Sequence, residues 1–190
     1  SGSLAGSDGT QSWLGSWTEL NDDGDPTTGL VQVTDRLAMR ERNTGAERSA
    51  NLENGAGATL SFDYKRKAFD GPSDYVTLEV STDGQTWVEL DRFAGPGTDQ
   101  AYLPAQYDLS AYNASYTSLR FVTAPDSMNQ YDTFFVDNFK ISYSTAPETH
   151  YPRLTGADVL HAAGITGRGV GVAVIDTGYF PHANLDQNTA

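Results

Sequence analysis

The sequence predicts a mainly β protein, an antiparallel β-sandwich of the jelly-roll type followed by a short α/β segment. Between residues 13 and 143, apolar and polar residues alternate in short stretches, and turns rich in glycine, proline, aspartate and asparagine separate them. No stretch in this range repeats with the period of an amphipathic helix. Many short strands with such turns are typical of two-layer sandwiches, and we favour the jelly roll over the immunoglobulin type.

The clearest pair of strands is a hairpin. In residues 75–81 every second side chain is a valine or a leucine, which is the pattern of a half-buried strand. Asp83 and Gly84 then supply turn residues before a second strand over residues 87–90. Further strands are expected over residues 30–33, 37–40, 58–64, 118–123 and 133–143.

The composition argues against several classes of partner. The chain of 190 residues has 25 acidic and 12 basic side chains, a formal net charge of −13. This charge would repel nucleic acids and anionic membrane surfaces, whereas it suits divalent cations. No apolar stretch is long enough to cross a bilayer. The chain has no cysteine, which excludes disulfides and thiolate metal sites. For an extracellular protein, this fits a secreted bacterial design that is stabilised by calcium rather than by disulfides.

Asp137 is the strongest chemical signal in the predicted sandwich. It falls in an otherwise apolar row formed by every second residue from 135 to 143, where an unpaired charge would be costly. Its partner could be an arginine such as Arg48, a cluster of backbone amides, or a cation. The acidic stretch Asn21-Asp22-Asp23-Gly24-Asp25 and the nearby Glu19 could supply the remaining ligands of such a cation.

We therefore predict a structural Ca²⁺ ion bound by carboxylates, with ligands Glu19, Asp22, Asp25 and Asp137 and with Asp23 as a further candidate. The acidic loop is not an EF-hand, because Pro26 and Gln32 stand where glycine and glutamate would be required. Two simpler interpretations stay open. The loop could be a solvated acidic turn while Asp137 pairs with an arginine, or a bulge near Asn138 could turn Asp137 outward.

Aromatic side chains are the second candidate functional feature of the sandwich. Such rings offer an apolar face with a polar edge, so they could form a stacking platform for sugars. The simpler interpretation is that most of them belong to the core and its rim. The residues in question are Trp13, Trp17, Tyr102, Tyr107, Tyr112, Tyr116 and Tyr131.

Several segments of this region resemble the jelly-roll modules of secreted bacterial proteins, which are relatives of carbohydrate-binding and MAM-like domains. They are residues 7–10 with Trp13, Trp17 and Glu19, residues 46–52, 58–64 and 81–87, and Val136-Asp137-Asn138. The resemblance implies the fold and often a bound calcium ion. It does not imply one ligand, so a glycan or a protein partner stays open.

The last part of the chain has a different pattern. Residues 145–153 are polar and contain two prolines, as expected of a linker. Thr155 can cap a helix that Gly164 ends, and the apolar strand Val170–Ile175 leads into Asp176-Thr177-Gly178. A strand of this kind suits a parallel α/β sheet, in which functional groups gather past the carboxyl ends of the strands. The simpler interpretation is that Asp-Thr-Gly only turns the chain.

From about Leu154 to Leu185, this order of elements resembles the start of the catalytic domain of subtilisin-like serine proteases. The resemblance implies that Asp176 is the acid of a Ser/His/Asp triad. The chain contains neither the His-Gly-Thr-His motif nor the Gly-Thr-Ser-x-Ala motif of that family. We therefore expect an inactive fragment of a secreted endopeptidase that cleaves protein or peptide substrates.

The predicted domains are a sandwich over residues 1–144, a linker over 145–153 and the first part of a protease domain over 154–190. The alternative function comes from the sandwich itself. In that case the chain is a calcium-stabilised extracellular module that binds a glycan or a protein and has no catalytic role.

Overall fold

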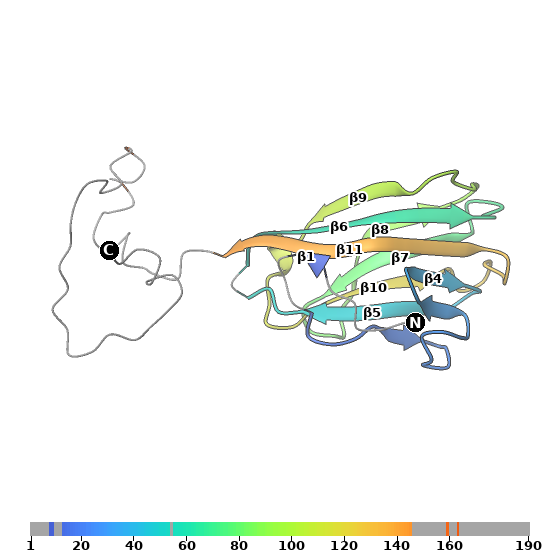
Figure 1. Ribbon diagram of the computed structural model, residues 1–190, viewed down its shortest axis with the longest axis horizontal. Helices are drawn as coiled ribbons and strands as arrows, with labels where there is room; N and C mark the ends of the chain where they lie inside the picture. The colour runs from blue at the N-terminus through green and yellow to red at the C-terminus, as the bar shows by residue number, and fades with distance from the viewer. Residues whose placement is uncertain (1–7, 10–12, 54, 146–158, 160–162, 164–190) are drawn as a thin grey trace. The chain divides into compact units, whose positions relative to one another are not determined.

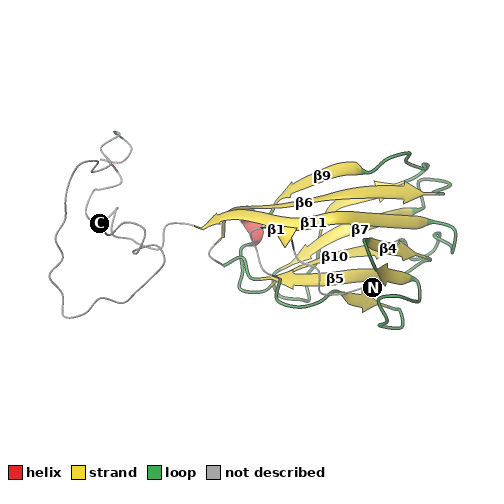
Figure 2. Ribbon diagram, viewed as in Figure 1, coloured by secondary structure: helices red, strands yellow, loops and turns green. Residues whose placement is uncertain are grey.

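The structure is a computed structural model, and it describes residues 8–9, 13–53, 55–145, 159 and 163. The chain divides into two units, Ser1–Ala146 and Pro147–Ala190. All the strands described belong to the first unit, which is a two-layer β-sandwich (Figure 1; Figure 2). No helix among the described residues is long and apolar enough to cross a membrane.

Sheet A has the strand order β3-β4-β11-β6-β9, and β1 adds a short parallel pairing to β11. Sheet B has the strand order β2-β5-β10-β7-β8. The bounds in sheet A are β1 Asp8–Gly9, β3 Val31–Val33, β4 Leu37–Arg40, β6 Gly55–Lys67, β9 Leu103–Asp108 and β11 Thr133–Thr145. Those in sheet B are β2 Thr18–Leu20, β5 Gly45–Ala50, β7 Tyr75–Ser81, β8 Val88–Ala94 and β10 Thr117–Thr123, and the 3₁₀ turn η1 spans Ser110–Tyr112.

The connections are those of a jelly roll. From β4 to β11 each strand lies in the opposite sheet from the strand before it, except for the hairpin β7–β8. The four-stranded set β4-β11-β6-β9 therefore faces β5-β10-β7-β8, as in two interlocked Greek keys. The structure confirms the predicted antiparallel sandwich and its predicted topology.

The core lies between the two sheets and is rich in aromatic rings. Phe121 of β10 packs edge-on against Phe62 of β6, with ring centroids 5.2 Å apart. It also contacts Phe134 at 6.0 Å and Phe139 at 5.7 Å, so one ring of sheet B touches three from sheet A. Such contacts join the two layers through burial of large apolar surfaces.

The predicted apolar row of the last strand is only half right. Phe134 and Val136, rather than Phe135 and Asp137, point into the core, whereas Ile141 points inward as expected. The reason is a β-bulge. Asp137 pairs with Asp63 and Lys140 with Ser61, so three steps on β11 face two on β6. The extra residue changes which face each later side chain takes.

The local pattern identified most strands but missed two long ones. The predicted strands over residues 75–81 and 37–40 have the observed bounds of β7 and β4. Strands β5 and β9 were not predicted. Strand β9 contains Pro104, and it can do so because it is an edge strand with one unpaired side.

The predictions for the last part of the chain lie almost wholly outside the described residues. These are the linker, the strand over residues 170–175 and Asp176. Within the predicted helix, the backbone N–H of Ala163 donates a hydrogen bond to the carbonyl of Val159 at 3.1 Å, a helical spacing. The predicted domain boundaries stay a prediction.

Candidate functional site

The first candidate site is the loop from β2 to β3. Each of Glu19, Asp22 and Asp23 offers a carboxylate oxygen, and these oxygens lie within 4.8 Å of one another. Asn21 at a φ of 57° and Gly24 at a φ of 78° turn the chain sharply between them. The local backbone thereby gathers three of the predicted acidic residues.

Asp22 closes this loop onto the start of β3. Its Oδ2 accepts hydrogen bonds from the backbone N–H of Leu30 at 2.7 Å and of Val31 at 2.6 Å. Gly29 lies against the same carboxylate, because a Cβ at this position would come within 2.4 Å of Asp22 Oδ2. The close approach explains why the loop needs a glycine there.

Glu19 carries an oxygen that the protein does not satisfy. Its Oε2 accepts a hydrogen bond from the backbone N–H of Gly24 at 2.9 Å, whereas its Oε1 is buried and has no partner. Burial, together with the neighbouring charges of Asp22 and Asp23, raises the pKa of Glu19. A hard cation would satisfy the orphaned oxygen and offset the repulsion, so these residues fit the predicted calcium ion.

The structure does not bring the other two predicted ligands into this group. Asp25 lies in the same loop, but its Oδ1 accepts hydrogen bonds from the backbone N–H and the hydroxyl of Thr27. Asp137 lies on β11, and its Oδ1 accepts from the backbone N–H of Asn138 at 2.8 Å. Among the described residues, the acidic groups close enough to share a metal ion do not include Asp137.

Arg48, the other predicted partner of Asp137, is buried among aromatic rings. Its guanidinium lies 5.0 Å from the ring centroid of Trp13 and 5.9 Å from that of Trp17, and its Nε donates to the carbonyl of Gly15. Burial lowers the pKa of Arg48 to about 10. The arginine therefore stabilises the start of the sandwich through cation–π contacts.

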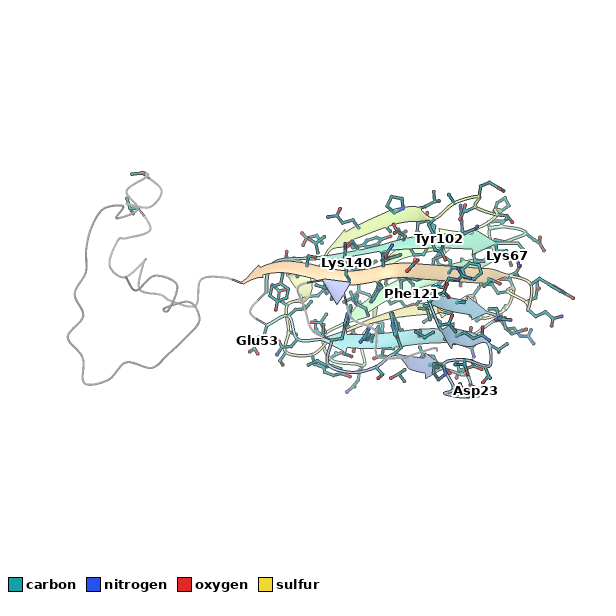
Figure 3. The ribbon with its side chains drawn as sticks, viewed as in Figure 1. Asp23, Glu53, Lys67, Tyr102, Phe121 and Lys140 are labelled. Atoms are coloured by element: carbon teal, nitrogen blue, oxygen red, sulfur yellow. The ribbon has the colours of Figure 1, made fainter. Side chains whose placement is uncertain are left out.

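The second candidate site is the outer face of sheet A, which sequence reasoning missed. The three lysines of the chain line hollows on this face, Lys65 and Lys67 one hollow and Lys140 another, and we call it the lysine face. Figure 3 labels Lys67 and Lys140. On β6 the side chains alternate, so Lys65 and Lys67 share this face with Asp63, while Phe62 points into the core.

One hollow of the lysine face lies over β11, β6 and β9 and has a volume of about 410 Å³. Its polar side chains include Gln106 of β9 and Lys140 of β11. Two of its lining residues are hydrogen bonded to each other, because Asn138 Nδ2 donates to Asp63 Oδ2 at 2.7 Å. The hollow therefore combines donors and acceptors of hydrogen bonds.

A second hollow of about 350 Å³ lies further along β6 and β11. It is lined by three cations, by two aromatic rings and by Thr98, Asp99 and Gln100; the cations are Arg36, Lys65 and Lys67, and the rings are Phe135 and Tyr102. Lys65 pairs with Phe135 across β6 and β11, and the Arg36 guanidinium lies 5.1 Å from the centroid of the Phe135 ring.

The single anion of this second hollow is already engaged. Asp99 forms a bidentate ion pair with Arg66, with Nη2 to Oδ1 at 2.9 Å and Nε to Oδ2 at 3.0 Å. These hydrogen bonds lower the pKa of Asp99. Arg36, Lys65 and Lys67 thus give this part of a strongly acidic protein a local positive charge.

Most of the seven aromatic side chains belong to the core and its rim, as in the simpler interpretation, and they do not gather into one platform. Trp17 is buried in the core, and Trp13 stacks on Phe139 with ring centroids 5.1 Å apart. Both tryptophans therefore belong to the core and its rim. Tyr107 and Tyr112 also pack against the core. Tyr116 and Tyr131 are exposed in separate loops, and Tyr102 alone of the seven lines a hollow of the lysine face.

No protein-family model matches the sequence, and no curated protein matches it. The sandwich is similar to several solved structures. One is TmCBM61 in complex with β-1,4-galactotriose, at 11% identity, covering 67% of this chain and 88% of that chain, with a TM-score of 0.48. Another is the CBM22-1 xylan-binding domain from Paenibacillus barcinonensis Xyn10C, at 18% identity, 77% and 94% coverage and a TM-score of 0.42.

A third is the K1 cleaved adhesin domain of Lys-gingipain from Porphyromonas gingivalis W83, at 13% identity. It covers 72% of this chain and 96% of that chain, with a TM-score of 0.46. Similarity at this level assigns neither a family nor a ligand to this chain. A functional conclusion has to come from the side chains.

Proposed function

We propose that the sandwich is a non-catalytic extracellular module that binds an acidic polysaccharide on the lysine face. The observation that carries this proposal is the hollow that Arg36, Lys65 and Lys67 line together with the aromatic rings of Phe135 and Tyr102. The carboxylate or sulfate groups of a glycan would pair with the cations, and the apolar faces of its sugar rings would pack on the two aromatic side chains.

The charge distribution favours an anionic ligand over a neutral one. The chain carries a formal charge of −13, and yet its three lysines all line the hollows of one face. The Arg36–Asp35 ion pair is loose, with 3.6 Å between Nη1 and Oδ2, and its side chains are 42% and 74% exposed. An exposed pair of this kind contributes little, so Arg36 keeps most of its capacity to bind an anion.

The shape of the face favours an extended ligand. The first hollow includes Ser61 and Asp63, and the second includes Lys65 and Lys67 further along β6. From Ser61 to Lys67 a strand extends for roughly 20 Å. A linear glycan lying along β6 would reach both hollows, whereas a monosaccharide would fill only one.

The test is a binding screen of the purified 190-residue chain by affinity electrophoresis and calorimetry. The panel contains neutral polysaccharides, namely xylan and galactan, the acidic polygalacturonate and alginate, a sulfated glycan, and polyglutamate as an acidic protein surrogate. We expect binding to an acidic glycan that weakens as salt increases, because exposed charge interactions are screened. Equal retention by neutral and acidic glycans would contradict the proposal, and so would binding of polyglutamate alone.

Variants locate the site. Phe135→Ala and Lys65→Ala should each weaken binding about tenfold or more, the equivalent of roughly 1.4 kcal/mol. Trp87→Ala is the matched control, because Trp87 is also an aromatic ring stacked under an arginine, Arg120 at 3.8 Å, but sits beside β8 of sheet B. If Trp87→Ala weakens binding as much as Phe135→Ala does, the lysine face is not the site.

We further propose that calcium stabilises this module through Glu19, Asp22 and Asp23. The proposal rests on the orphaned Glu19 Oε1 and on the short separation of the three carboxylates. Asp25 remains a candidate through its second oxygen. We leave Asp137 out of this proposal, because its carboxylate is not among the oxygens that lie within 4.8 Å of one another.

A second candidate function rests on the sequence alone, on the order of elements from about Leu154 to Leu185. In this proposal the chain is part of a secreted subtilisin-like endopeptidase, with Asp176 as the acid of the triad. The 190-residue chain should not hydrolyse a protein substrate. If the natural protein continues past Ala190, the continuation must contain the His-Gly-Thr-His and Gly-Thr-Ser-x-Ala motifs. Their absence from the continuation would reject this function and leave the binding module intact.

A further inference from the structure

A second acidic cluster lies where two loops meet, and none of its members belongs to the predicted calcium site. Asp70 and Asp74 come from the loop between β6 and β7, and Asp132 precedes β11. Each offers a carboxylate oxygen, and the three oxygens lie within 4.8 Å of one another. Asp74 and Asp132 are buried, at 6% and 1% exposure, whereas Asp70 is exposed.

The two buried carboxylates use one oxygen each to shape their own loops. Asp74 Oδ2 accepts hydrogen bonds from the backbone N–H of Asp70 at 2.7 Å and of Gly71 at 3.1 Å. Asp132 Oδ2 accepts from the backbone N–H of Asn129 at 2.8 Å. The two loops therefore hold their carboxylates in place by backbone contacts.

The second carboxylate oxygen of Asp132 indicates that this cluster lacks a partner. Asp132 Oδ1 is buried and has no hydrogen-bond partner. Leaving a buried carboxylate oxygen unsatisfied is costly, and such an atom in a native protein points to a missing partner. None of the ion pairs in the described part of the chain involves Asp70, Asp74 or Asp132, so no arginine or lysine fills that role.

The electrostatics point the same way. Burial raises the pKa of Asp132, and the nearby carboxylates of Asp74, Asp70 and Glu41 raise it further. Three acids gathered without a countercharge repel one another, and the repulsion is strongest for the two that are buried. A bound cation would remove this repulsion and satisfy Oδ1.

We propose that Asp70, Asp74 and Asp132 form a second divalent-cation site, which takes Ca²⁺. All donors are carboxylate oxygens, the ligands that hard cations prefer, and the exposed Asp70 leaves one side open for water ligands. Ca²⁺ accepts six to eight oxygens in a flexible geometry, which suits ligands from two separate loops better than the strict octahedron of Mg²⁺ does. The ion would tie the β6–β7 loop to the start of β11.

The experiment is calorimetric titration of the 190-residue chain, stripped of metals, with CaCl₂ and separately with MgCl₂. Asp132→Asn keeps the shape of the side chain and removes its charge, so it should lower the number of bound Ca²⁺ ions by one. Asp70→Asn changes an exposed ligand that should not affect folding, and it should weaken the same site about tenfold. Asp126→Asn, an exposed acid in the β10–β11 loop, is the matched control and should bind as the parent does.

One more variant, Asp23→Asn, distinguishes Ca²⁺ binding at this site from Ca²⁺ binding at the Glu19 group. Asp23→Asn should weaken Ca²⁺ binding at the group of Glu19, Asp22 and Asp23 only. The effects of Asp23→Asn and Asp132→Asn on Ca²⁺ binding should therefore be independent. If Asp132→Asn does not fold, Asp70→Asn decides the question. The proposal is overturned if Asp70→Asn and the parent bind Ca²⁺ with the same affinity and stoichiometry. A site that prefers Mg²⁺ over Ca²⁺ would overturn the assignment of the ion.

Discussion

Asn138 Nδ2 donates a hydrogen bond to Asp63 Oδ2 at 2.7 Å, and this bond joins β11 to β6 at the bulge. Asn138 has a φ of 53°, in the left-handed region that asparagine tolerates better than most residues. The bulge keeps Phe135 on the lysine face while it sends Phe139 and Ile141 toward the core. The extra residue of the bulge thus determines which side chains of β11 point away from the core.

We predict that Asn138→Ala destabilises the protein by about 2 kcal/mol, because alanine is strained in the left-handed region and the bond to Asp63 is lost. Asn138→Gly loses the bond but relieves the strain, so it should cost about 1 kcal/mol less than alanine. Urea unfolding of both variants gives the comparison. Equal destabilisation by glycine and alanine would show that backbone strain at the bulge has no energetic weight.

We predict that Gly29→Ala is more damaging than Gly84→Ala, although both glycines have a φ of 71°. The strain of a left-handed alanine is common to both and costs about 1 kcal/mol. At Gly29 the new Cβ also collides with the Asp22 carboxylate, whereas at Gly84 it meets nothing within 4 Å. Gly29→Ala, unlike Gly84→Ala, should therefore lower the free energy of unfolding in urea by a further ~1 kcal/mol or more. It should also weaken calcium binding.

Calcium should raise the melting temperature of the chain, and Glu19→Gln should reduce that gain. A ligand at one hundred times its Kd stabilises the native state by about 2.7 kcal/mol. Glutamine keeps the size of the side chain but binds a cation poorly. The measurement is thermal unfolding with chelator and with excess calcium. An identical gain in the parent and in Glu19→Gln would remove Glu19 from the site.

The ion pair of Asp99 with Arg66 should give stability that depends on pH. The pKa of Asp99 is lowered in the folded state, so its contribution is present above the unfolded value of 3.8 and is lost as the pH falls through the lowered folded value. At pH 7, Asp99→Asn should cost about 1.5–3 kcal/mol, typical of hydrogen bonds to charged groups.

The difference between Asp99→Asn and the parent should therefore shrink only in strongly acidic solution, as urea unfolding at pH 7 and below pH 4 would reveal. Asp35→Asn is the matched control, because Asp35 pairs with Arg36 in the open and should change stability little. A difference at pH 7 that is no larger for Asp99 than for Asp35 would contradict the prediction.

Phe121→Ala should be among the most destabilising substitutions in the core. The ring is fully buried and touches Phe62, Phe134 and Phe139 of the opposite sheet. Removing it leaves a cavity and should cost about 3–5 kcal/mol. Tyr131→Ala, at 71% exposure, should stay within about 0.5 kcal/mol. Chemical denaturation of the two variants measures both effects.

The sequence by itself determined the class of fold and most strands. Alternation of apolar and polar side chains is a local property, and it locates β4 and β7 with their observed bounds. The acidic loop with Glu19, Asp22 and Asp23 was also visible in the sequence, because these acidic residues lie within a few residues of one another. The same alternation predicted that Asp137 lies in an apolar row. This prediction is wrong, because a bulge, whose position depends on pairing with β6, interrupts the alternation.

Only the tertiary structure decided which distant side chains share a surface. Lys65 and Phe135 lie opposite each other because β6 pairs with β11, and Arg36 joins them from the turn between β3 and β4. Asp74 and Asp132 come together because two loops meet beside the start of β11. Strand pairing and loop closure bring together segments that are far apart in the chain. Local periodicity therefore predicts neither of these two groups of side chains.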